Sequence, residues 1–204
     1  MPEGNTKRGA AAVAAGIVEG DAPREVGQWM RALEDEHVPT ATEAARVVEE
    51  LVRLAPNLAA PHIERLVRLL ASSQPRVVRA SAATLPELAR VAPAKVARHL
   101  PKLREAFDGV TDIARDGIVR TFVSLCLASV AYQRRLIDIL RHALTHAPDK
   151  TLVQWSEIVL PALKGEPHAE AREVVEARIP SLPRPLAQKL AKQLGLTLRP
   201  SNAP

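Results

Sequence analysis

The sequence predicts an all-α solenoid, in which pairs of antiparallel helices stack along the chain. The segment VVRASAATLPEL at 77–88 recurs as LVQWSEIVLPAL at 152–163, and IARDGIVRTFVS at 113–124 lies between them. The intervals of 36 and 39 residues are typical of repeat arrays. Elsewhere, apolar residues recur at three- and four-residue spacing, and no run alternates apolar with polar residues, which disfavours strands.

Composition indicates one folding unit with an aliphatic core. The 204 residues are 47% hydrophobic but only 2% aromatic, so leucine, valine, isoleucine and alanine must fill the interior between closely packed helices. The length suits one large domain or a short repeat array. We expect a flexible N-terminal tail at 1–20, an α-solenoid at 21–194 and a C-terminal tail at 195–204.

Residues typical of helix ends place the helices in the first half. Asp21 followed by Pro23 is a cap with proline in the first turn. Trp29, Met30 and Leu33 then form the apolar stripe of the first helix. Later breaks fall at 37–39, 56–57, 72–75 and 92–93. We expect helices at 23–36, from 40 or 42 to 54, at 60–71, and at 76–91 with a bend or shortening at Pro86.

The second half continues the alternation of helices and short turns. Turn residues lie at 108–110, 147–150 and 164–167, and Gly195 suits a C-terminal cap. This makes about ten helices in five antiparallel pairs. The later helices are expected at 95–107, 112–129, 132–146, 151–163, 170–179 and 183–194.

Cysteine usage and hydropathy exclude several classes of protein. Cys126 is the single cysteine and lies in the apolar run FVSLCLASV, so we expect a buried thiol and no intrachain disulfide. No stretch approaches the length of a membrane span. We therefore expect a cytoplasmic protein without membrane contact.

Charge is concentrated in the middle of the chain. Six basic and 10 acidic side chains give residues 1–59 a net charge of −4, whereas 14 basic and seven acidic ones give residues 60–146 a net charge of +7. This asymmetry predicts either an electropositive surface for an anionic partner or simply a solvated charged face.

The repeated segments resemble the HEAT-repeat family. RVVRASAATLPELA at 76–89 is similar to the family's B helix, which opens with Val-Arg and continues into small residues. HLPKL, with Pro101, is similar to its proline-containing A helix. The resemblance covers about 22–194 and implies a right-handed superhelix of about five HEAT-like pairs, with A helices convex and B helices concave. The resemblance concerns helix packing and gives almost no information about function.

The sequence departs from one feature of the family. Many members bond a turn aspartate to an arginine of the B helix, and these bonds form a ladder along the array. Here Asp149 faces Gln154, and the turn position before Arg79 and Arg115 is held by Gln74 and Val110, which cannot neutralise them. Either these arginines bond other carboxylates such as Asp112 or Asp116, or they are available to a partner outside the chain.

By analogy with the fold, we expect a non-enzymatic scaffold that binds a protein in its concave groove. Trp155 aligns with positions 80 and 116, which we expect to lie outside the core. Its indole is therefore either an exposed anchor or fills a gap in the last repeat. The alternative function is binding of nucleic acid or another polyanion through the basic middle. The expected macromolecule-binding residues are Arg76, Arg79, Arg115, Arg120 and Trp155.

No motif for catalysis or cofactor binding is present, and we expect neither a catalytic residue nor a cofactor. A DNA-glycosylase-like enzyme, with Glu157 or Asp116 as its acid, is a third reading. Asp138, His142 and His146 share a helix face, either as zinc ligands or as a solvated surface. They extend too far along one helix to chelate one ion unaided, so we expect no metal. The oligomeric state is not determined by these patterns.

Overall fold

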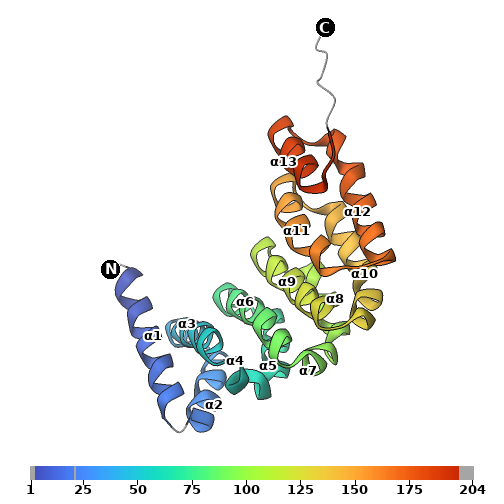
Figure 1. Ribbon diagram of the computed structural model, residues 1–204. Helices are drawn as coiled ribbons and strands as arrows, with labels where there is room; N and C mark the ends of the chain where they lie inside the picture. The colour runs from blue at the N-terminus through green and yellow to red at the C-terminus, as the bar shows by residue number, and fades with distance from the viewer. Residues whose placement is uncertain (1–2, 21, 198–204) are drawn as a thin grey trace. The chain divides into compact units, whose positions relative to one another are not determined.

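The computed structural model describes residues 3–20 and 22–197, and its regular secondary structure there is entirely helical (Figure 1). The chain divides into two compact units, Met1–Leu125 and Cys126–Pro204, which we call the N-terminal and C-terminal units. The all-α class is therefore confirmed, whereas a single solenoid over 21–194 stays a prediction. Within the described ranges, no helix combines the length and the apolar character needed to cross a membrane.

Helices of the N-terminal unit form two rows. In one row α1 packs on α3 and α3 packs on α6, and helices of the second row cover them through the α2–α3, α5–α6 and α6–α7 contacts. The short helices η1 and η2 flank α5 on either side. The bounds are α1 Glu3–Glu19, α2 Ala22–Ala32, α3 Val38–Leu54, α4 Pro56–Ala59, η1 Ala60–His62, α5 Ile63–Arg68, η2 Leu69–Ala71, α6 Pro75–Val91, α7 Pro93–Ala97, α8 Leu100–Gly109 and α9 Asp112–Ala128. The last turn of α9, residues 126–128, belongs to the C-terminal unit.

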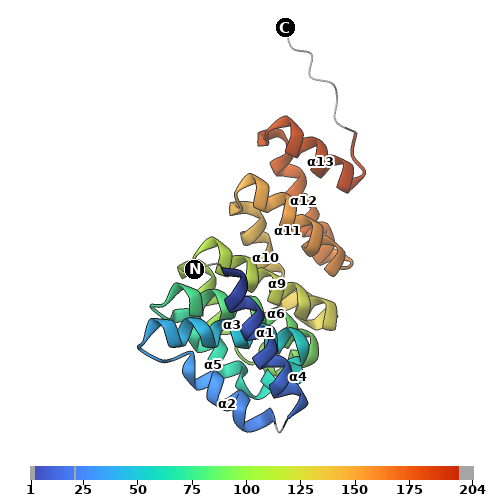
Figure 2. The same ribbon diagram turned by 90° about the vertical axis from the view of Figure 1, so that its left-hand side faces the viewer.

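The expectation of a flexible tail at 1–20 is wrong for most of that segment. Residues 3–19 form α1, which lies beside α3 (Figures 1 and 2). Ala10, Ala14 and Ile17 are buried, at spacings of four and three residues. Alanine has the highest helix propensity, and its small side chain permits close approach to α3. The alanine-rich segment is therefore a packed helix.

Two expected helices are each divided in the structure. The helix expected at 95–107 ends at Ala97 and resumes at Leu100, with Pro101 in the first turn of α8. Proline lacks the N–H that would continue the hydrogen bonds of α7. The helix expected at 60–71 likewise becomes η1, α5 and η2. Pro86 does not shorten α6, which continues to Val91.

A close crossing joins α6 and α9. Gly117 is buried, and a Cβ atom at this position would lie 2.4 Å from the backbone oxygen of Ala82. Real Cβ atoms do not approach a backbone oxygen so closely, so the crossing requires glycine here. The repeat alignment places Ser81 and Ser156 at the position of Gly117, and both serines are fully buried.

The C-terminal unit is built mainly from four helices. Contacts of α10 with α12, and of α11 with both α12 and α13, hold it together. Gly195 ends α13 in the left-handed conformation, with φ 68°, which confirms the predicted cap. Most of the expected C-terminal tail lies outside the described residues. The bounds are α10 Val130–His146, α11 Asp149–Ala162, α12 Glu166–Arg178, η3 Ile179–Ser181 and α13 Arg184–Leu194.

Candidate functional site

Trp155 is part of the core and is not an exposed anchor. Its exposed fraction is 3%, because α11 packs against α10, α12 and α13. Ala80, which the repeat alignment places opposite it, is only 1% exposed, so the expectation that this position lies outside the core is wrong. Of the two alternatives for Trp155, the buried one is therefore correct: the indole fills space among the helices of the C-terminal unit. The expected groove between Arg76 and Trp155 also joins residues of two different compact units.

Arg76 is neutralised within the N-terminal unit. Its Nη1 donates to Oε1 of Glu49 at 2.8 Å, and its Nη2 donates to Oε2 of the same carboxylate. Both side chains are about three-quarters buried. This two-point contact joins α3 to α6, so Arg76 stabilises the packing of successive helices.

Arg115 and Arg120 also have partners on the chain. Arg115 donates from Nε to the carbonyl oxygen of Phe107 at 3.0 Å and from Nη1 to Oδ1 of Asp112 at 3.0 Å. Its guanidinium also donates to the carbonyl of Val110 at the end of α8. The alternative in which Arg115 bonds a nearby carboxylate is confirmed. Arg120 donates from Nε to Asp116 at 2.7 Å, one turn away.

Arg79 differs from the other three predicted arginines. It is exposed on α6, and no hydrogen bond or ion pair joins it to any other residue in 3–20 or 22–197. Of the five predicted contact residues, Arg79 alone combines exposure with an uncompensated charge in the described structure. The sequence analysis predicted too many arginines free to bind a partner molecule, because the carboxylates that pair with them are brought close only by tertiary packing.

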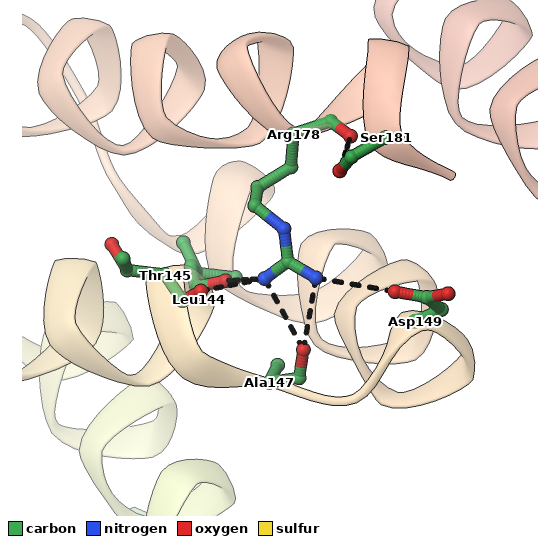
Figure 3. A network of polar contacts seen from close by, with 6 residues as sticks. All are labelled: Leu144, Thr145, Ala147, Asp149, Arg178 and Ser181. Carbon is green, nitrogen blue, oxygen red and sulfur yellow. Dashed lines mark hydrogen bonds and ion pairs between the residues drawn. The ribbon is translucent and has the colours of Figure 1, made fainter.

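Asp149 bonds an arginine that the sequence comparison did not suggest. Arg178, at the end of α12, donates from Nη2 to Oδ1 of Asp149 at 3.2 Å (Figure 3). Its Nη1 also donates to the carbonyl oxygens of Leu144 at 3.3 Å, Thr145 at 2.6 Å and Ala147 at 3.2 Å. Arg178 therefore caps the C-terminal end of α10, where carbonyls lack partners within the helix. This role is structural.

A surface hollow between α5–η2 and α8 is the feature that sequence reasoning missed. It has a volume of about 410 Å³. Its floor includes Val67 and Leu70, each 3% exposed. No local sequence pattern indicated it, because the residues that line it come from segments about 35 residues apart. We call it the α5–α8 hollow, lined by Val67, Arg68, Leu70, Ala71, Lys102, Glu105, Ala106, Gly109 and Val110.

Three unpaired cations lie on the α7–α8 segment, and one of them, Lys102, lines the hollow. Lys95, Arg98 and Lys102 are exposed, and none of them forms an ion pair or hydrogen bond within the described ranges. We call these three residues the cationic face. Arg68, on the opposite wall, donates to Glu34 at 2.5 Å, and this hydrogen bond raises the pKa of Arg68 above its ordinary value.

The metal and acid candidates lie in local contacts on their helices. The described residues contain no cluster of three or more side chains suited to a metal ion, so Asp138, His142 and His146 do not form one. The rings of the two histidines lie 4.4 Å apart, and Nδ1 of His146 is 2.9 Å from the carbonyl oxygen of His142. Glu157 bonds Lys189 at 2.8 Å.

The α5–α8 hollow and the cationic face, which share Lys102, make up the candidate functional site. Comparison of the chain with protein-family models and with curated proteins finds no match. The lining of the hollow combines the buried apolar residues Val67 and Leu70 with the charged residues Arg68, Lys102 and Glu105.

Proposed function

We propose that this protein is a non-enzymatic protein-binding module, a scaffold of HEAT-like helix pairs whose partner docks at the α5–α8 hollow. The observation that carries the proposal is the open space above Val67 and Leu70. An apolar side chain entering it would lose contact with water, at about 25 cal/mol per Å² of apolar surface. Binding energy at protein interfaces is concentrated in such anchored side chains.

Rigid support of the hollow favours this function. Arg65 and Arg68 of α5 both contact the carboxylate of Glu34, at 3.5 and 2.5 Å. The Arg76–Glu49 contact then ties α6 to α3. A surface that is already ordered loses less conformational entropy when a partner binds. Arg65, Arg68 and Arg76 thus join neighbouring helices of the N-terminal unit.

The proposal is tested by capture of partners from a cell lysate with matched variants. Ala106→Arg fills the hollow from a half-buried position on α8. Ala83→Arg, at an exposed position on α6 of the same unit, introduces the same side chain elsewhere. We expect partners retained by the wild-type chain to be lost with Ala106→Arg and kept with Ala83→Arg. Identical sets of captured proteins from all three chains would refute docking at the hollow.

Binding of a polyanion is the second candidate, because Arg79 and the cationic face are exposed and unpaired within the described residues. It predicts steep salt dependence, since phosphate contacts release counterions. The test is fluorescence anisotropy of labelled duplex and single-stranded DNA at about 50 and 200 mM salt. An Arg79→Glu, Lys102→Glu variant is expected to lose such binding. Absence of binding at the lower salt concentration would refute this candidate.

A further inference from the structure

We infer that the cationic face, formed by Lys95, Arg98 and Lys102, contacts the phosphate backbone of a nucleic-acid duplex without reading its bases. This inference rests on the polyanion candidate, and it names both the ligand and the surface that binds it. It does not depend on a partner in the α5–α8 hollow. Two observations carry it, namely positive charge that the described residues do not neutralise and an exposed surface that offers little besides that charge.

Most of the positive charge near the face is neutralised by the chain itself. Residues 65–104 contain nine basic side chains and one acidic side chain. Five of the nine have a partner within the chain, namely Arg65, Arg68, Arg76, Arg90 and Arg104. Of the remaining four, Arg79 lies on α6 and the other three form the cationic face. Among the described residues of this stretch, the uncompensated charge is therefore concentrated on the α7–α8 segment.

The three cations lie on one exposed side of this segment. Lys95 belongs to α7 and Lys102 to the first turn of α8, with Arg98 between them. Val96 and Leu100, which alternate with the cations in the sequence, are at most 3% exposed. At a rise of about 1.5 Å per residue the face spans about 10 Å, and the phosphates of one DNA strand rise about 3.4 Å each. The face therefore has the length of about three phosphates of one strand.

The face itself offers charge and no anchor for other ligands. None of the large apolar side chains that are exposed in the described structure belongs to residues 93–109. A protein interface or a membrane surface gains most of its binding energy from such side chains. Phe107 is the aromatic residue of α8, and it is 3% exposed, so it gives no platform on which an unpaired base could stack. A duplex backbone needs cations alone, because counterion release drives its binding.

The test measures how the affinity of the full chain for random-sequence duplex DNA changes between about 50 and 200 mM salt, by fluorescence anisotropy. A Lys95→Gln, Arg98→Gln variant removes two charges from the face. An Arg184→Gln, Lys192→Gln variant is the control, because it removes two exposed charges from α13 in the other unit that have no partner in the described part of the chain. Both variants therefore have the same net charge, and they differ only in where the charge is lost.

For the unmodified chain we expect the logarithm of the affinity to fall with the logarithm of the salt concentration with a slope of about −3. The face variant should reduce the size of this slope by about two and weaken binding at low salt at least about tenfold, whereas the control should stay within about twofold. Equal effects of the two variants would overturn the inference and keep the polyanion candidate. Absence of duplex binding at about 50 mM salt would overturn both. Tighter binding of single-stranded DNA, or of vesicles that contain phosphatidylserine, would overturn the duplex as the ligand.

Discussion

Replacing Arg178 by methionine is expected to destabilise the C-terminal unit by about 2–4 kcal/mol. Methionine keeps an apolar stem but removes every donor that contacts Leu144, Thr145, Ala147 and Asp149. The free energy of unfolding should fall because these carbonyls lie at the end of α10, where the helix supplies no partner.

The magnitude follows from the exposure of the acceptors. A hydrogen bond from a charged donor contributes about 1.5–3 kcal/mol, and a buried acceptor left unpaired costs about 1–3 kcal/mol. Leu144 and Ala147 are buried residues, whereas Thr145 is exposed and the side chain of Asp149 is 42% exposed. Water can replace the guanidinium at the two exposed acceptors. The estimate therefore counts mainly the two buried residues.

Two further variants separate geometry from charge. Arg178→Lys keeps a positive charge at the C-terminal end of α10, which stabilises a helix by about 0.3–1 kcal/mol. It lacks the planar fork that reaches several acceptors at once, so most of the loss should remain. Arg184→Met is the control, because Arg184 is exposed and forms no hydrogen bond or ion pair in the described part of the chain. It should change stability by less than about 0.5 kcal/mol.

The assay follows the fluorescence of Trp155 after Trp29 has been replaced. Trp155 is buried in the C-terminal unit, and Trp29 belongs to the N-terminal unit. In a Trp29→Phe background, urea unfolding followed by fluorescence reports on the C-terminal unit alone. A change below about 0.5 kcal/mol for Arg178→Met, or equal stability of Arg178→Lys and wild type, would refute the reasoning.

Three other substitutions and one labelling experiment test the packing. Gly117→Ala should destabilise the N-terminal unit by about 1–3 kcal/mol in urea unfolding followed by circular dichroism, because its Cβ meets the Ala82 backbone. Gly27→Ala, with no atom within 4 Å of its Cβ, should stabilise by about 0.4–1 kcal/mol; equal effects would contradict the crossing. Trp155→Ala should cost about 3–5 kcal/mol in chemical unfolding, and a cost below 1 kcal/mol would argue against burial. Burial raises the pKa of the Cys126 thiol from 9.0 to about 12, so a disulfide reagent at pH 8 should label it only after unfolding. Because the folded state keeps the proton, stability should fall as the pH rises from about 9 towards 12, and rapid labelling of the native chain would contradict this.

Helix positions were predictable because the signals that set them are local. The cap at Gly195 and the long helix α6 follow from glycine conformation and apolar spacing, and both are confirmed. The interruption between α7 and α8 could have been read from Pro101. The helix α1 was not predicted, for a different reason. Its alanine-rich segment has no strong apolar stripe and becomes ordered by packing on α3.

The candidate site was much less predictable. Arg76 and Arg79 are three residues apart on one helix, yet one pairs with Glu49 of another helix and the other is exposed. The α5–α8 hollow is formed by segments about 35 residues apart, and no local pattern fixes their separation.

The sequence by itself determined an all-α chain, the approximate bounds of most helices after α1 and the burial of Cys126. Propensity, caps and apolar periodicity act over a few residues and can be read along the chain. Only the tertiary structure decided that Trp155 is core, that Arg178 caps α10, and that Val67 and Leu70 form the floor of a hollow. These properties depend on which helices approach each other and how closely, and that geometry arises from the packing of all side chains together.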